Sequence, residues 1–148
     1  MREHDLPQVV AIEQQAYEFP WSLGIFKDCL RVGYCCWTLA FDDAVAGYCI
    51  MSVAAGEAHV LNVCVDETRR RRGHARRMLE HMVTLARGHR ATILFLEVRP
   101  SNRAAIDLYL DFGFRQLAVR RDYYPARDGR EDALVLALRF DEDAPPGS

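Results

Sequence analysis

The sequence contains no apolar run that approaches the ~20 residues needed to cross a bilayer, so no membrane-spanning helix is predicted. Its N-terminus is acidic and helical in character rather than basic and then apolar, which argues against a signal peptide. The five cysteines include no CxxC pair, and the adjacent Cys35 and Cys36 could not form an ordinary disulfide with each other. We therefore expect a soluble, cytoplasmic protein with buried thiols and no membrane contact.

A strong excess of either charge is also missing. The formal net charge is only −2 over 148 residues, whereas a nucleic-acid-binding protein is usually more basic. Half of the residues are apolar, which is enough for one self-standing domain, and we place it at residues 1–140. Residues 141–148 hold two prolines and three acids and are expected to be disordered. We expect a monomer with no direct requirement for nucleic acid.

Hydrophobic periodicity predicts a mixed α/β (α+β) fold without internal repeats. Helices are predicted at residues 6–17, 22–31, 73–88 and 102–112, and strands at 35–41, 46–54, 59–65, 92–98, 115–121 and 133–140. The first three strands read as an antiparallel meander, and a loop at 123–132 joins the last two. The strand, helix and strand between residues 59 and 98 imply a parallel pair, with the crossover helix on one face of the sheet.

Six of the eighteen arginines lie within nine residues, at positions 69–72, 76 and 77. The cluster separates a strand-like run from a helix-like run, so Gly73 stands where a helix begins. The first amides of a helix lack intrahelical partners and carry the positive end of its dipole, so a helix start can bind an anion. Gly73 and the small Ala75 would let a pyrophosphate come close. Taken as charge alone, the stretch equally fits a solvated basic face or a patch that contacts nucleic acid.

Glu97 is the only charge inside the apolar run 92–98. Burying an unpartnered carboxylate is costly, so such a residue usually borders a cavity or has a partner. One interpretation is a strand-end glutamate paired with Arg99 or another arginine, and the other is a functional carboxylate. Tyr109, on the helix that follows, is either a core hydroxyl with one hydrogen bond or an acid that faces the same cavity.

Together these features resemble the GNAT superfamily of N-acetyltransferases. Residues 70–75, Arg-Arg-Arg-Gly-His-Ala, fit its Gln/Arg-x-x-Gly-x-Gly/Ala pyrophosphate loop, and Glu97, Asn102 and Tyr109 follow in the family's order. The resemblance is closer still to the bacterial ribosomal-protein alanine N-acetyltransferases, the RimI type. The matching segments are Ile12–Gln14, Phe19–Ser22, Leu96–Arg99, Tyr123–Pro125 and Asp128–Ala133, and the resemblance covers nearly the whole chain.

The resemblance implies a GNAT fold with helices on both faces of a mostly antiparallel, twisted sheet, in which the parallel fourth and fifth strands splay to admit acetyl-CoA. Glu97 would accept the proton, Tyr109 would protonate the departing thiolate, and neither an acyl-enzyme nor a metal would take part. The residues implied to bind the acetyl-CoA co-substrate are Val63, Cys64, Val65, Arg71, Arg72, Gly73, His74, Ala75, Arg76 and Asn102.

The implied reaction is acetyl transfer to the N-terminal α-amino group of a protein, best matched by the N-terminal alanine of a small-subunit ribosomal protein. Acceptor contacts are expected from Trp21, Tyr123, Tyr124, Asp128 and Glu131. The two tyrosines fit strand-edge packing equally well, and the two acids fit a solvated surface. Two alternatives stay open: an acetyltransferase for another protein N-terminus, lysine or small amine, and a non-catalytic RNA- or ribosome-binding module that uses the arginines.

One departure from the family pattern concerns the N-terminus. The family's first strand normally precedes the first helix, whereas here only Met1 to Asp5 comes before it. We therefore expect that strand to be a stub or missing.

Overall fold

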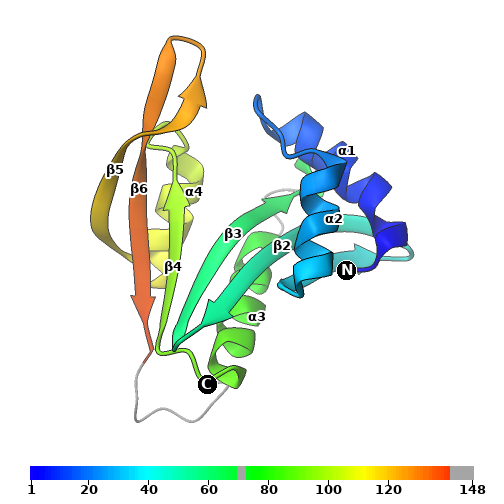
Figure 1. Cartoon of the computed structure of the whole chain (residues 1–148), viewed down its shortest axis with the longest axis horizontal. Coiled ribbons are helices and arrows are strands. Elements are labelled where there is room, and N and C mark those ends of the chain that lie inside the picture. Colours follow the sequence, from blue (N-terminus) through cyan, green and yellow to red (C-terminus); the bar gives the residue numbers. More distant parts are fainter. Residues whose placement is uncertain (70–72, 141–148) are drawn as a thin grey trace. The chain divides into compact units, whose positions relative to one another are not determined.

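The computed structural model describes residues 1–69 and 73–140. Over these residues the predicted helices and most of the predicted strands are confirmed. The helices are α1 (Leu6–Ala16), α2 (Leu23–Val32), α3 (His74–Gly88) and α4 (Arg103–Phe112), with short 3₁₀ helices η1 (Glu3–Asp5) and η2 (Glu67–Arg69). The strands are β1 (Cys35–Phe41), β2 (Ala44–Ala54), β3 (Glu57–Val65), β4 (Ile93–Val98), β5 (Arg115–Ala126) and β6 (Gly129–Arg139) (Figure 1).

The strands form one mixed sheet in the order β1-β2-β3-β4-β6-β5. The pairs β1/β2, β4/β6 and β5/β6 are antiparallel, and β3/β4 is parallel. The expectation that the fourth and fifth strands form the parallel pair is therefore wrong by one position. Among the described residues only η1 precedes α1 and no strand does, so the strand count begins at Cys35 and the parallel pair becomes the third and fourth strands. The parallel pairing joins Glu57–Val60 to Ile93–Leu96, and both strands run on beyond it, β3 to Val65 and β4 to Val98.

The described chain divides into two compact units. Unit 1 comprises Met1–Val53 and Leu61–Met82, and unit 2 comprises Ala54–Val60 and the chain from Val83 onwards. Strand β3 and helix α3 each contribute residues to both units. The single domain predicted for residues 1–140 stays a prediction.

In unit 1, helices cover both faces of the strands. On one face, Val9 of α1 and Phe26 of α2 pack in one buried cluster with Tyr48 and Ile50 of β2. On the other face, β2 meets α3 at Gly47, where an added Cβ would lie 2.8 Å from the Cys64 carbonyl oxygen and 3.0 Å from the Met78 sulfur. Because successive strand residues point to opposite faces, these contacts place α3 opposite α1 and α2.

Unit 2 contains β4, β5, β6 and α4. Its buried residues include Leu94 and Leu96 of β4, Leu136 of β6, and Ile106 and Tyr109 of α4. The α4 helix begins after its N-cap Asn102, and Phe114, two residues beyond the end of the helix, packs its ring 5.8 Å from the Tyr109 ring.

The loop predicted at 123–132 is wrong, because most of it is strand. Strands β5 and β6 form a long hairpin whose last pair is Ala126 with Gly129 (Figure 1). Proline is tolerated on an edge strand, where one side of the backbone has no strand neighbour, and β5 is such a strand. Pro125 therefore does not end the strand, and it lies opposite Arg130.

Candidate active site

The predicted co-substrate residues of β3 lie at the end of that strand, in unit 1. The side chains of Cys64 and Val65 are buried, and Val63 is half-buried. The carbonyl of Val63 accepts a hydrogen bond of 3.0 Å from the Tyr17 hydroxyl, which ties this strand to the end of α1. These three residues come after the last β3 residue that pairs with β4, Val60.

The start of α3 follows Gly73, where the sequence predicts an anion site. Gly73 has a φ of +78°, which favours glycine, and a Cβ added there would meet nothing within 4 Å. An open approach to the start of a helix is a place where an anion can meet the first backbone N–H groups. His74 packs its ring 5.2 Å from that of Phe41, Ala75 is half-buried, and the exposed Arg76 lies 3.9 Å from Glu80. The predicted ligands Arg71 and Arg72 lie outside the described residues.

A buried carboxylate holds the segment that carries Trp21. Glu13 of α1 is only 2 % exposed. One of its oxygens accepts hydrogen bonds from the Tyr48 hydroxyl at 2.6 Å and the Asn62 amide at 2.9 Å, and the other accepts from the Trp21 backbone N–H at 2.8 Å. The Trp21 ring lies 5.4 Å from that of Phe26. The core of unit 1 thus fixes the position of Trp21, which is predicted to contact the acceptor peptide.

In unit 2, Glu97 has a partner at each carboxylate oxygen. Oε2 lies 2.6 Å from His59 Nε2, and Oε1 lies 3.4 Å from a guanidinium nitrogen of Arg120. Burial alone raises the pKa of Glu97, but the hydrogen bonds and charges of His59 and Arg120 outweigh it, so the net effect lowers the pKa below its ordinary 4.5. The sequence left open a pairing with an arginine, and that arginine is Arg120; Arg99 instead pairs with Glu131.

Two tyrosines, Tyr109 and Tyr124, belong to the same unit as Glu97. Tyr109 is buried on α4. Burial and then the nearby charge of Glu97 raise the pKa of Tyr124, and Tyr109 contributes to the same effect. Tyr124 thus lies within electrostatic range of both predicted catalytic residues, and its phenol stays protonated at neutral pH.

Asn102 caps α4 through its side chain. Its Oδ1 accepts a hydrogen bond of 3.3 Å from the Ala105 backbone N–H, so the residue predicted to contact acetyl-CoA also begins a helix. The side-chain NH₂ is the group that remains for a ligand.

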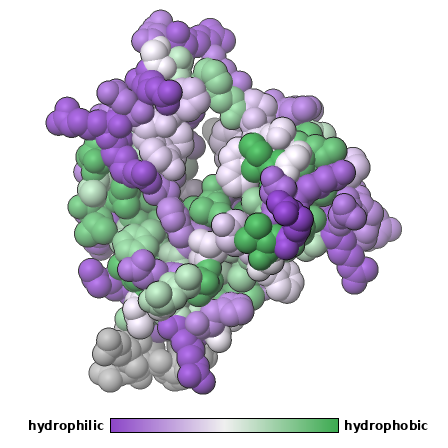
Figure 2. Space-filling view, viewed as in Figure 1, coloured by the Kyte–Doolittle hydropathy of each residue, from purple (hydrophilic) through white to green (hydrophobic). Residues whose placement is uncertain are grey.

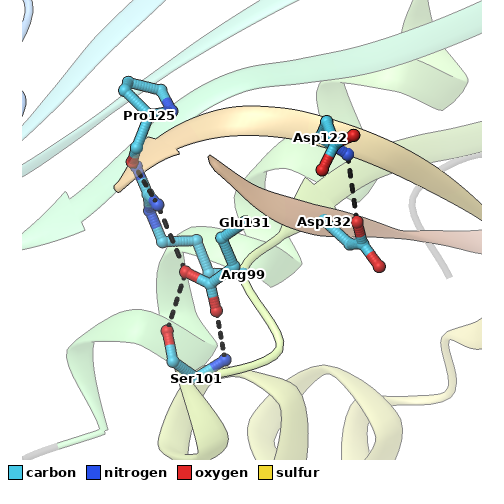
Figure 3. Close-up of polar contacts among 6 residues, drawn as sticks. All are labelled: Arg99, Ser101, Asp122, Pro125, Glu131 and Asp132. Atoms are coloured by element: carbon cyan, nitrogen blue, oxygen red, sulfur yellow. Dashed lines mark hydrogen bonds and ion pairs between the residues drawn. The ribbon is translucent and has the colours of Figure 1, made fainter. Parts of the chain in front are cut away.

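The predicted acceptor residue Glu131 joins β6 to the turn before α4. Its carboxylate accepts hydrogen bonds from the Ser101 backbone N–H at 3.0 Å, the Ser101 hydroxyl at 3.1 Å and Arg99 at 3.2 Å (Figure 3). The same Arg99 donates to the Pro125 carbonyl at 2.9 Å and stacks 4.4 Å from the Tyr124 ring. Glu131 therefore has structural partners in addition to any role at the substrate.

Tyr123 lies on the exposed edge strand β5, where the Arg120 guanidinium stacks 4.2 Å from its ring. The neighbouring backbone is irregular, because the pairing with β6 shifts between Arg120 and Tyr124 and Asp122 has a φ of +51°. Figure 2 shows hydrophilic residues gathered over the tip of the hairpin, which contains the exposed Asp128.

Sequence reasoning missed three residues that the structure brings to these positions. They are His59, Arg120 and Glu13, the first two at Glu97 and the third at Trp21. A histidine at the start of an apolar strand was a usable signal for His59. Nothing in the local sequence distinguishes Arg120 from the chain's other arginines.

Among residues 1–69 and 73–140, no group of three or more histidine, cysteine, aspartate or glutamate side chains could hold a metal ion. Within the same ranges, every helix is too short or too polar to span a bilayer.

The sheet with its parallel pair, and the helix α3 that follows Gly73, agree with the fold of one enzyme class, the acetyl-CoA-dependent N-acetyltransferases, and the comparisons with known proteins place the chain in that class. The chain belongs to the Acetyltransferase (GNAT) family, whose profile matches residues 3–114.

The relatives are similar over nearly their whole length. The curated "[Ribosomal protein bS18]-alanine N-acetyltransferase" of Escherichia coli K12 is 41% identical over 134 residues, which cover 90% of each chain. The protein of the same name from Haemophilus ducreyi is 33% identical over 137 residues, covering 92% of this chain and 94% of that one. The crystal structure of the ribosomal-protein-S18-alanine N-acetyltransferase from Escherichia coli superimposes with a TM-score of 0.87 at 38% identity, covering 97% of this chain and 95% of that one.

Proposed function

We propose that this acetyltransferase moves the acetyl group of acetyl-CoA to the N-terminal α-amino group of ribosomal protein bS18, at its alanine. The observation that carries the proposal is the 41% identity over 90% of both chains with an enzyme named for that reaction. The match covers 90% of this chain, so it extends well beyond the residues predicted to carry out the reaction.

Acetyl-CoA supplies the acetyl thioester in this reaction. The chain offers it the backbone of Val63, Cys64 and Val65, the helix start from Gly73 to Arg76, and the side-chain amide of Asn102. The open surface at Gly73 supports this assignment, since a helix start that lacks a Cβ suits an anion. Arg71 and Arg72 complete the proposed pyrophosphate contacts by sequence.

Glu97 and Tyr109 are proposed to move the protons. An α-amino group has a pKa of about 7.7–8.0, against about 10.4 for lysine, so neutralising it at pH 7 costs roughly 1 kcal/mol instead of roughly 4.6. A single carboxylate, directly or through one water, is a sufficient proton acceptor for that task. The Tyr109 hydroxyl supplies one proton to the leaving sulfur, whose pKa as a thiol is about 8.5.

The acceptor peptide is proposed to contact Trp21, Tyr123 and Glu131. The hydrogen bond from the Trp21 amide to Glu13 and the stacking of Arg120 on Tyr123 support this, because both hold aromatic surfaces in fixed positions. A pre-organised contact loses less side-chain entropy when a flexible peptide binds.

Mass spectrometry tests the proposal directly. The protein is incubated with acetyl-CoA and a peptide that has the N-terminal sequence of bS18, and we expect one acetyl group on the N-terminal alanine. Controls are the same peptide with a blocked N-terminus and an unblocked peptide of unrelated sequence. Modification of a lysine in the blocked peptide, with none on the free N-terminus, would contradict the proposal.

The assignments of Glu97 and Tyr109 are tested in the same assay. Glu97→Gln should lower turnover and change the pH profile with nearly unchanged coenzyme binding, and Tyr109→Phe should slow the chemical step in a folded protein. Unchanged rates between roughly pH 6 and 9 in the first variant would remove Glu97 from the proton path.

A further inference from the structure

Each carboxylate oxygen of Glu97 has a partner. Oε2 lies 2.6 Å from His59 Nε2 and Oε1 lies 3.4 Å from Arg120. The Glu97 side chain is only 10 % exposed, whereas that of His59 is 35 % exposed. An incoming amine therefore reaches the imidazole more readily than the carboxylate behind it.

The sheet holds the two residues on one face. In the parallel register His59 of β3 lies opposite Phe95 of β4, and Glu97 follows two residues after Phe95. Since side chains alternate along a strand, Phe95 and Glu97 point to the same side as His59. Both members of the pair thus stand on strands rather than on loops, which keeps the distance between them short and constant.

The hydrogen bond also fixes which nitrogen of the ring is available. An ionised carboxylate only accepts hydrogen bonds, so Nε2 is the nitrogen that donates to Glu97, and in the neutral imidazole Nδ1 is then the nitrogen with the lone pair. Within the described parts of the chain, Glu97 is the only polar partner of the His59 ring. Nδ1 is thus a proton-accepting atom on a half-exposed ring that a buried carboxylate orients.

We propose that His59 Nδ1 is the atom that takes the proton from the acceptor amine, and that Glu97 acts through His59 as a positioning residue. This inference rests on the proposed function and refines the role given there to Glu97. The arrangement follows the general logic of an acid–histidine pair, in which the carboxylate sets the tautomer and stabilises the imidazolium.

The proton balance agrees with the exposure of the ring. An ammonium group loses two protons when it becomes an amide: the first goes to His59 Nδ1, and the amine lone pair then forms the C–N bond as the C–S bond breaks. The second proton leaves the same nitrogen and returns to the Tyr109 oxygen, replacing the proton that Tyr109 gives to the departing sulfur. The net reaction releases one proton, and a half-exposed imidazole can pass it to water. Among the described residues, the charged and titratable groups that face His59 and Glu97 are Arg120 and Tyr124, both on β5.

The test compares His59→Gln with the unchanged protein. Glutamine keeps an N–H that can reach Glu97 but has no basic atom, so kcat should fall by about 10²-fold or more with little change in the KM for acetyl-CoA. Added imidazole should restore part of the activity in His59→Gly. His4→Gln, an exposed position in unit 1, is the matched control and should retain full activity. A His59→Gln variant with unchanged kcat and pH profile would overturn the proposal.

A second measurement does not depend on any variant. Nitrogen-15 NMR of histidine-labelled protein, recorded in the neutral form of the ring, should place the His59 hydrogen on Nε2, and the opposite tautomer would overturn the proposal. Failure of the unchanged protein to acetylate the bS18 peptide would instead contradict the proposed function. The two failures can be told apart. The His59 test compares the kcat of His59→Gln with that of the unchanged protein, and this ratio can be measured with any amine that the protein acetylates.

Discussion

The Tyr48 hydroxyl donates a hydrogen bond of 2.6 Å to Glu13 inside the core of unit 1, where both side chains are almost completely buried. Burial is the main cause that raises the pKa of Tyr48, so the phenol remains a donor at any working pH. The same carboxylate holds the Trp21 amide. Stability of the core and the position of a proposed acceptor contact therefore depend on one buried group.

Tyr48→Phe should lower the free energy of unfolding by about 1–3 kcal/mol, because it leaves a buried carboxylate oxygen with one fewer donor. Urea denaturation of variant and parent measures the difference. Tyr34→Phe is the control: Tyr34 is 38 % exposed, and its substitution should change stability by no more than about 0.5 kcal/mol. Equal effects at the two positions would mean that the buried hydrogen bond contributes nothing.

Gly47→Ala should also destabilise unit 1. The added Cβ would lie 2.8 Å from the backbone oxygen of Cys64, which cannot move without disturbing β3, so we expect a loss of about 1–3 kcal/mol. The control is Gly24→Ala in α2, where the nearest atom is the Ser22 hydroxyl oxygen at 3.7 Å. Alanine is the better helix former, so that variant should gain about 0.5–1 kcal/mol. Thermal or urea unfolding of both variants gives the comparison.

The lowered pKa of Glu97 makes the stability of the protein depend on acid pH. Its folded-state pKa lies below the ordinary 4.5, so on acidification the unfolded chain binds a proton before the folded one does. The contribution is fully present above the unfolded pKa and is lost as pH falls through the folded pKa. Urea denaturation between about pH 6 and 3 should therefore show a steeper loss of stability for the parent than for Glu97→Gln. Arg120→Gln should lie between the two, because it removes one of the two groups that lower the pKa.

The sequence was sufficient for most elements because their signals are local. Ser22 caps α2 with a hydrogen bond to the Ile25 backbone N–H, and the lone charge in β4 marked Glu97 as a residue that needs partners. The identity of those partners could not be predicted from the sequence. His59 is 38 positions away and meets Glu97 only through the parallel register of β3 and β4. Arg120 lies where the β5 pairing becomes irregular, and no local pattern predicts such a shift.

The β5–β6 hairpin is longer than the sequence predicts for a related reason. Pro125, Gly129 and the charges between them are typical of a loop. The strand can continue because β5 is an edge, and Arg99, in the turn before α4, donates hydrogen bonds to Pro125 of β5 and to Glu131 of β6. These contacts connect residues more than 25 positions apart, so they follow from the fold and not from the local sequence.

The role of Glu131 can be separated into its structural and substrate parts. Its hydrogen bonds to Ser101 and Arg99 outweigh burial and lower its pKa, so it is ionised at neutral pH and holds both partners. Glu131→Ala should increase hydrogen exchange in residues 123–131 and raise the peptide KM several-fold, because the hairpin that carries Tyr123 and Tyr124 loosens.

Ser101→Ala removes one of the same hydrogen bonds and leaves the carboxylate in place. If Glu131 acts only by holding the hairpin, Ser101→Ala should show a smaller effect of the same kind on both exchange and KM. Asp128→Ala at the exposed tip is the control and should leave exchange unchanged; a rise in KM without faster exchange in Glu131→Ala would assign Glu131 to direct peptide contact instead.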